Sequence, residues 1–174
     1  MSRYMNLIGI KARKASDKKI DTKTKNKVLN DYAKIIVKEK NAILKENIKD
    51  VQFAKKNGLK ENLINRLFIN EKKLDTIKQS IQTIKKLKDP VNVILDKWKR
   101  PNGLNISRVT IPIGVIGVVY ESRPNVTSDV ASLSFKSGNS AILKGGSEAI
   151  NTNRILAKLF RKALKINKVD ENYI

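Results

Sequence analysis

The fold is decided by residues 111–146, which read IPIGVIGVVYESRPNVTSDVASLSFKSGNSAILKGG. The β-branched run over residues 111–120 predicts a strand buried on both faces. A polar turn follows, then a helix expected over residues 128–136, then a second strand over residues 140–144 that ends at a Gly-Gly turn. This order of strand, helix and strand is typical of the beginning of a parallel α/β nucleotide-binding domain.

The residues before this unit predict a helical layer, because their apolar side chains recur at helical spacing. We expect four helical segments: 22–46, 47–58, 61–68 and 71–87. Asp21 is suited to cap the first of them, and Gly58 to end the second in a left-handed conformation. Alternation over residues 104–110 predicts an exposed strand with one apolar face.

After the unit, residues 147–166 predict a longer helix, and residues 169–174 predict entry into another strand. The chain therefore belongs to the α/β class. We expect an N-terminal helical segment over residues 1–100 that packs on an incomplete nucleotide-binding α/β domain over residues 101–174.

The composition narrows the chemistry available to the chain. Its 174 residues include no cysteine and no histidine, which excludes disulfides, thiolate nucleophiles, imidazole bases and the usual zinc sites. We expect no metal site. No apolar run approaches the ~20 residues that span a bilayer, and no signal peptide is evident at the start. These features predict a cytoplasmic protein without a membrane partner.

The formal net charge of +21 admits two interpretations. Clustered lysine and arginine bind phosphate groups, so the chain could be a basic, non-catalytic protein that binds nucleic acid or another acidic partner. The lysines are instead spread singly along predicted helical faces, as at Lys34, Lys38 and Lys45, which is typical of solvated surface. Aromatic residues make up only 5% of the chain, and no aromatic-basic recognition motif is present. The interpretation of the lysines as solvated surface charge is therefore favoured.

Two groups of residues lie where a nucleotide-binding sheet collects its ligands, outside the carboxyl ends of the strands. In the turn after the first strand, Asn125 could support a developing oxyanion and Arg123 could hold a phosphate or carboxylate. Without a functional role, Asn125 would be an ordinary turn residue after Pro124, and Arg123 would be a surface arginine.

The second group follows the second strand, at Lys144-Gly145-Gly146-Ser147-Glu148. Its glycines permit close approach of a ligand to the backbone, and a helix N-terminus favours anions. Ser147 is equally suited to be a helix N-cap, and Lys144 could be a simple charge at a strand end. The pattern matches neither a dinucleotide fingerprint nor a P-loop.

Taken together, these stretches resemble one family. Residues 111–153, with Trp98-Lys99-Arg100-Pro101-Asn102-Gly103-Leu104 upstream, are similar to the glutamate-5-semialdehyde dehydrogenases (gamma-glutamyl phosphate reductases) of the aldehyde dehydrogenase superfamily. Residues 47–67 also resemble the N-terminal helices of that family. The resemblance covers almost the whole chain, as its N-terminal portion.

The resemblance implies an NADPH-dependent reduction of L-glutamyl 5-phosphate to L-glutamate 5-semialdehyde in proline biosynthesis. Asn125 then matches the amide that supports the oxyanion, and Ser122 with Arg123 lies beside the substrate. The cofactor-binding residues that it implies are Lys144, Gly145, Gly146, Ser147 and Glu148. The intact enzyme is expected to be a homo-oligomer, with the exposed strand helping the subunits associate.

One departure from the family limits these expectations. The family uses a nucleophilic cysteine from a downstream catalytic domain, and this chain has no cysteine. We therefore expect a truncated portion that is inactive alone, either without its partner domain or completed by a separately encoded C-terminal half.

Overall fold

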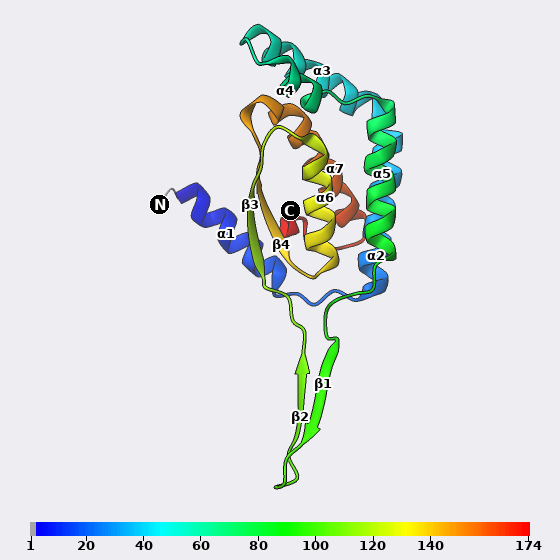
Figure 1. Cartoon of the computed structure of the whole chain (residues 1–174), viewed down its shortest axis with the longest axis vertical. Helices are drawn as coiled ribbons and strands as arrows, with labels where there is room; N and C mark the ends of the chain where they lie inside the picture. Colours follow the sequence, from blue (N-terminus) through cyan, green and yellow to red (C-terminus); the bar gives the residue numbers. More distant parts are fainter. Residues whose placement is uncertain (1–2) are drawn as a thin grey trace.

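The computed structural model describes residues 3–174. All elements of secondary structure before its first strand are helices (Figure 1). The helices are α1 (Arg3–Ser16), α2 (Thr22–Lys38), α3 (Lys40–Lys56), α4 (Glu61–Leu67) and α5 (Glu71–Lys86). Helix α1 was not predicted. The helix predicted over residues 61–68 is confirmed as α4 and that over 71–87 as α5, within one residue at each end.

The capping predictions for this layer are confirmed, but one boundary is wrong. Asp21 accepts a hydrogen bond from the Thr24 N–H at 2.7 Å, and Gly58 has φ +69°. The helix predicted over residues 22–46 is broken at Glu39, so that α3 starts at Lys40 rather than at residue 47. Helical periodicity continues across the break, because both helices bury apolar faces against α7, and the pattern therefore hides the turn.

The predicted nucleotide-binding unit contains β3 (Val115–Val119), α6 (Pro124–Lys136) and β4 (Ser140–Lys144), followed by α7 (Ile150–Ile166). Strands β3 and β4 are parallel, as predicted. Helix α1 lies on one side of this sheet and α6 on the other (Figure 1).

The prediction of a strand buried on both faces over residues 111–120 is wrong. The strand covers only β3, and Ile111, Ile113 and Val119 are 78%, 79% and 83% exposed. Among residues 3–174, β3 pairs only with β4 and leaves its other edge open. Residues 3–174 therefore do not bury the apolar residues 111–120 on both faces.

A second, two-stranded sheet projects from the helical body as a hairpin (Figure 1). It pairs β1 (Ile94–Lys99) with β2 (Asn105–Val109) in antiparallel fashion, with Trp98 opposite Ile106. The exposed strand predicted over residues 104–110 is confirmed as β2. Its partner β1 was not predicted, because all six of its residues are exposed and no burial pattern marks them.

One hydrophobic core joins the helices on both sides of residue 100. At its centre, the ring of Tyr32 from α2 lies 4.7 Å from that of Phe160 from α7, and Phe135 from α6 packs edge-on against Phe160. Tyr173 packs on Phe135 from a short 3₁₀ turn, η2 (Glu171–Tyr173). The predicted strand over residues 169–174 is therefore wrong, since Tyr173 turns inward to complete this aromatic cluster. The division at residue 100 stays a prediction.

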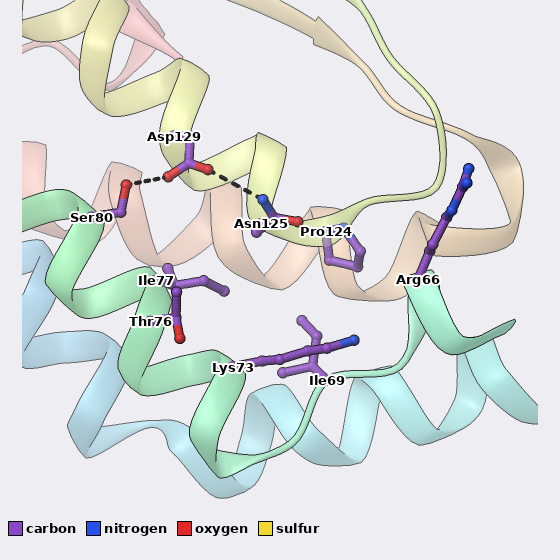
Figure 2. Close-up of a pocket in the computed structure, with 9 residues that line it drawn as sticks. All are labelled: Arg66, Ile69, Lys73, Thr76, Ile77, Ser80, Pro124, Asn125 and Asp129. Atoms are coloured by element: carbon purple, nitrogen blue, oxygen red, sulfur yellow. Dashed lines mark hydrogen bonds between the residues drawn. The ribbon is translucent and has the colours of Figure 1, made fainter. Parts of the chain in front are cut away.

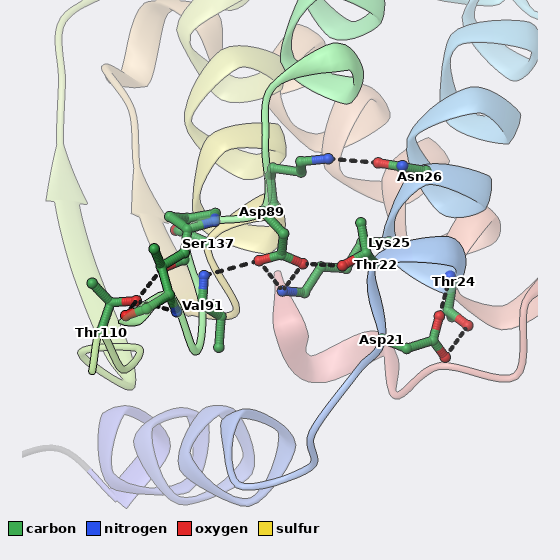
Figure 3. A network of polar contacts seen from close by, with 12 residues as sticks. Asp21, Thr22, Thr24, Lys25, Asn26, Asp89, Val91, Thr110 and Ser137 are labelled. Carbon is green, nitrogen blue, oxygen red and sulfur yellow. Dashed lines mark hydrogen bonds and ion pairs between the residues drawn. The ribbon is translucent and has the colours of Figure 1, made fainter. Parts of the chain in front are cut away.

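A polar network anchors the base of the hairpin to α2 (Figure 3). The Lys25 ammonium is almost fully buried and lies 2.9 Å from the Asp89 carboxylate. Asp89 also accepts hydrogen bonds from the Thr22 hydroxyl and the Val91 N–H. Burial raises the pKa of Asp89, but the hydrogen bonds from Lys25, Thr22 and Val91 lower it further, so that the net shift is downward.

Within residues 3–174, no helix combines the length and the apolar character that crossing a membrane requires.

Candidate functional site

The carboxyl ends of β3 and β4 form a tight cradle. Their pairing continues past β3, where the Tyr120 N–H donates to the Lys144 carbonyl at 3.1 Å. The Ser122 hydroxyl donates to the Glu148 carboxylate, so the turn after β3 is tied to the segment after β4. The structure thus brings together predicted residues that are more than twenty positions apart in the sequence.

Both glycines of this cradle are required by close contacts rather than by an unusual φ. A Cβ on Gly146 would lie 2.7 Å from the Ser122 hydroxyl and 3.0 Å from the Glu148 carboxyl carbon. A Cβ on Gly145 would overlap the Asn153 amide and approach the Tyr120 ring to 2.9 Å. Any larger residue would fill the cradle and displace its walls.

Glu148 is held as a carboxylate in this cradle. The hydrogen bond from Ser122 is the main cause that lowers its pKa, with a further contribution from the Ser147 hydroxyl. The positive charge of Lys144 acts in the same direction. The cradle therefore combines hydroxyl groups, a carboxylate and an exposed ammonium group around the Gly145-Gly146 backbone.

The prediction that Ser147 is a helix N-cap is wrong. Residues Ser147–Ala149 form a 3₁₀ turn, η1, and α7 begins at Ile150. Ser147 instead donates to the Glu148 carboxylate at 3.2 Å. This frees the Ser147 side chain from a capping role and leaves it exposed at the rim of the cradle.

Two of the free N–H groups at the start of α7 are satisfied by Asp50, which comes from α3. Its buried carboxylate accepts from the Asn151 N–H at 3.1 Å, and from the N–H and hydroxyl of Thr152 at 2.7 and 2.6 Å. An acidic side chain at a helix N-terminus also stabilises the helix dipole. No sequence signal predicts this cap, because about a hundred residues separate Asp50 from α7.

Three further side chains stabilise the turn between β3 and α6 by hydrogen bonds. The hydroxyl groups of Tyr120 and Thr127 lie 2.7 Å apart, and Thr127 donates to the Asn153 Oδ1 at 2.9 Å. Burial raises the pKa of Tyr120, so the phenol stays neutral. These contacts fix the direction in which the turn leaves the sheet.

Asn125 lies in the first turn of α6, not in a loop. The helix predicted to start at residue 128 starts at Pro124, whose fixed φ suits the first helical position. The Asn125 amide donates to the Asp129 carboxylate at 3.2 Å, and Asp129 accepts a second hydrogen bond from the Ser80 hydroxyl at 2.7 Å (Figure 2). Asn125 thus lies at the α5–α6 cavity and remains exposed.

Between α5 and α6 the structure contains a cavity of about 200 Å³ (Figure 2). It is lined by Arg66, Ile69, Lys73, Thr76, Ile77, Ser80, Pro124, Asn125 and Asp129. Of these residues, sequence reasoning selected only Asn125 as functional. The others lie on helices whose pattern showed apolar faces and solvated lysines or, in the case of Ile69, in the connection between α4 and α5, so nothing marked them as neighbours of the turn.

Arg123 remains separate from both groups. It precedes α6, is exposed, and forms no hydrogen bond or ion pair through its side chain within residues 3–174. The predicted residues therefore fall into three places: the cradle, the α5–α6 cavity with Asn125, and the free Arg123.

Comparisons with known proteins find relatives of similar sequence and solved structures of similar fold. The chain is 44% identical over 166 residues to the gamma-glutamyl phosphate reductase of Caldanaerobacter subterraneus, covering 94% of this chain and 40% of that relative. The crystal structure of gamma-glutamyl phosphate reductase from Thermotoga maritima superimposes with a TM-score of 0.93 at 40% identity, over 95% of this chain and 41% of that one.

This chain is homologous to the N-terminal part of the gamma-glutamyl phosphate reductases. The family resemblance predicted from the sequence motifs is confirmed. A propionaldehyde dehydrogenase from Rhodopseudomonas palustris, at 14% identity and a TM-score of 0.63, shares the fold. No family model matches the chain. The chain spans about two fifths of the length of the reductases it matches.

Proposed function

We propose that this chain supplies the cofactor cradle and the oxyanion-supporting amide of an NADPH-dependent reductase. The reaction is the conversion of L-glutamyl 5-phosphate to L-glutamate 5-semialdehyde and phosphate in L-proline biosynthesis. The observation that carries the proposal is the cradle itself, in which Gly146 leaves room for the Ser122 hydroxyl and the Glu148 carboxylate to meet at the carboxyl ends of β3 and β4. Homology to gamma-glutamyl phosphate reductases supports the choice of reaction.

The residues of the cradle fit a nicotinamide dinucleotide. Carboxylate and hydroxyl groups at Glu148 and Ser147 can bond ribose hydroxyls, and Gly145 and Gly146 allow a ligand to approach the backbone. Lys144 offers a cation for the 2′-phosphate that distinguishes NADPH from NADH. When bound, this cofactor supplies a hydride.

We propose that Asn125 stabilises negative charge on the substrate's acyl oxygen. Its amide sits at the start of a helix, where N–H dipoles also favour negative charge. A preorganised donor of this kind contributes ~3 kcal/mol to transition-state stabilisation. Arg123 can hold the phosphate of the substrate with two hydrogen bonds, and Ser122 would line the same turn.

The nucleophilic thiol of this chemistry has to come from outside these residues, because the sequence contains no cysteine. We propose that the C-terminal part of the reductase, to which these residues do not extend, supplies it. Mixing the purified chain with a candidate C-terminal half should produce NADPH oxidation that neither part shows alone.

The cradle is tested by titrating the purified chain with NADPH and with NADH, monitored by cofactor fluorescence. Lys144→Ala is expected to weaken NADPH binding about tenfold, the cost of one charge-assisted contact, and to leave NADH nearly unchanged. Lys97→Ala, which removes an exposed lysine on β1, is the matched control. Equal effects of the two substitutions, or equal effects on both cofactors, would contradict the proposed role of Lys144.

We further propose that the β1–β2 hairpin takes part in self-association. Leu95, Trp98, Leu104 and Val109 are 43–56% exposed on it, which is unusual for large apolar side chains and marks a contact surface. Trp98→Lys should lower the mass measured by light scattering after gel filtration. An unchanged mass would contradict a role of the hairpin in self-association.

A further inference from the structure

Two short stretches of the chain have the same sequence but different surroundings. Asn57-Gly58-Leu59 follows the end of α3, and Asn102-Gly103-Leu104 lies in the turn at the tip of the β1–β2 hairpin (Figure 1). An asparagine followed by glycine readily loses its side-chain amide, because glycine has no side chain to hinder attack by its backbone nitrogen. The two copies allow the effect of the fold on this reaction to be separated from that of the sequence.

The glycines of the two stretches are closely alike. Both are exposed and both have a positive φ, +69° at Gly58 and +88° at Gly103. The Gly58 N–H donates to the Lys55 carbonyl at 3.1 Å, and the Gly103 N–H donates to the Arg100 carbonyl at 2.9 Å. The difference between the two stretches therefore lies in their asparagine side chains.

The Asn57 side chain is bound back to its own helix. Its Nδ2 donates to the Phe53 carbonyl at 2.8 Å, one turn earlier in α3. Nδ2 is the atom that leaves in deamidation, and this hydrogen bond holds the amide away from Gly58. The reaction at Asn57 therefore requires that the bond to Phe53 first be broken.

The Asn102 side chain is instead folded forward over the turn. Its Oδ1 accepts a hydrogen bond from the Leu104 N–H at 3.2 Å, and its Nδ2 has no hydrogen-bond partner within residues 3–174. A bond from the N–H two residues ahead closes a ring that includes the Gly103 nitrogen and brings the Asn102 Cγ toward it. The same N–H stabilises negative charge that develops on Oδ1 during attack at Cγ.

We propose that Asn102 is a site of spontaneous deamidation and isoaspartate formation, and that the fold protects Asn57 from the same reaction. The Gly103 nitrogen loses its proton to solvent and attacks the Asn102 Cγ, so that a new C–N bond forms and negative charge develops on Oδ1. The Cγ–Nδ2 bond then breaks, and ammonia leaves with a proton taken from water. The product is a cyclic succinimide. Water opens this ring at either carbonyl and produces aspartate or isoaspartate, without oxidation or reduction.

The reaction changes both the charge and the backbone of the hairpin tip. Either product adds a negative charge close to Lys99 and Arg100, and isoaspartate also lengthens the backbone by a methylene group. The Arg100 N–H donates to the Leu104 carbonyl at 2.9 Å across this turn, so the longer backbone would disturb the bond that closes the hairpin. The reaction needs neither cofactor nor substrate, and the inference is therefore independent of the proposed function.

The test follows both asparagines in one sample of the full chain, incubated at mildly alkaline pH and then digested for mass spectrometry. In the folded chain, Asn102 is expected to deamidate about tenfold faster than Asn57, which corresponds to the one hydrogen bond that must be broken at Asn57. In guanidinium chloride, which unfolds the chain, the two rates should become nearly equal, because both stretches read Asn-Gly-Leu.

Asn102→Gln is the matched variant, because its longer side chain would have to form a larger ring. It should remove the product at the hairpin tip and leave both the rate at Asn57 and the NADPH titration unchanged. Equal rates at the two asparagines of the folded chain would overturn the inference. So would a faster reaction at Asn102 that persists in guanidinium chloride, since the preceding Pro101, and not the fold, would then be its cause.

Discussion

The aromatic core and the β1–β2 hairpin place large apolar side chains in opposite environments. Tyr32 and Phe160 are fully buried between α2 and α7, whereas Trp98 is 43% and Leu104 56% exposed on the hairpin. Burial of apolar area stabilises a fold, so the helical core contributes to the stability of this chain and the hairpin hardly does. The contrast is the basis for the proposed role of the hairpin in self-association.

The largest expected effect tests the core side of this comparison. Phe160→Ala removes a ring that contacts both Tyr32 and Phe135, and should lower the free energy of unfolding by about 4 kcal/mol. Urea unfolding followed by circular dichroism measures it. A loss below about 1 kcal/mol would mean that the cluster is loosely packed.

The next effect concerns the buried link between α3 and α7. Asp50→Asn removes the carboxylate that accepts from the start of α7 and leaves some of those donors without a partner. We expect a loss of about 2–3 kcal/mol in the same urea experiment. Asp17→Asn is the matched control and should change stability by less than about 0.5 kcal/mol. Similar values for both would show that α7 is capped in another way.

The cradle is closely packed but polar. We therefore expect a substitution there to have an effect on stability between those in the aromatic core and on the hairpin. Gly146→Ala places a methyl group against Ser122 and Glu148 and should cost about 1–2 kcal/mol in stability. Because the methyl group also fills the cradle, NADPH affinity should fall in the same variant. Gly117→Ala, where no atom lies within 4 Å of the new Cβ, provides the control in the neighbouring strand. Unchanged NADPH affinity in Gly146→Ala would place the cofactor elsewhere.

The pH dependence of stability tests the base of the hairpin. The folded-state pKa of Asp89 is lowered, so its contribution to stability is present above the unfolded pKa of about 3.9 and is lost as the pH falls through the folded value. The urea midpoint should therefore decline below about pH 4, and Asp89→Asn should flatten that part of the decline. A parallel decline in both proteins would assign the acid sensitivity to other carboxylates.

The smallest effect completes the comparison. Trp98→Ala on the hairpin should lower the free energy of unfolding by at most about 1 kcal/mol, because 43% of the residue stays exposed and it does not pack against the hydrophobic core. A loss approaching that of Phe160→Ala would show that the ring is buried in solution, by a second subunit or by another part of the protein.

The residues of the cradle could be predicted from the sequence, but its shape could not. Lys144 to Glu148 follow a recognisable strand, and parallel strands place their carboxyl ends at one edge. The bond between Ser122 and Glu148, however, depends on how the turn after β3 folds back. The α5–α6 cavity was beyond prediction for the same reason, since Asp129 and Lys73 look like solvated charges on separate helices.

The sequence by itself determined helices α4 and α5, the order of β3, α6 and β4, the helix ends at Asp21 and Gly58, and which family the chain resembles. These properties depend on local backbone preferences and on short motifs, which act over a few residues. Only the tertiary structure decided that α2 and α3 separate at Glu39, that Asp50 caps α7, and that the apolar run before β3 stays exposed. Each of these depends on contacts between segments far apart in the chain, whose free energy no local pattern contains.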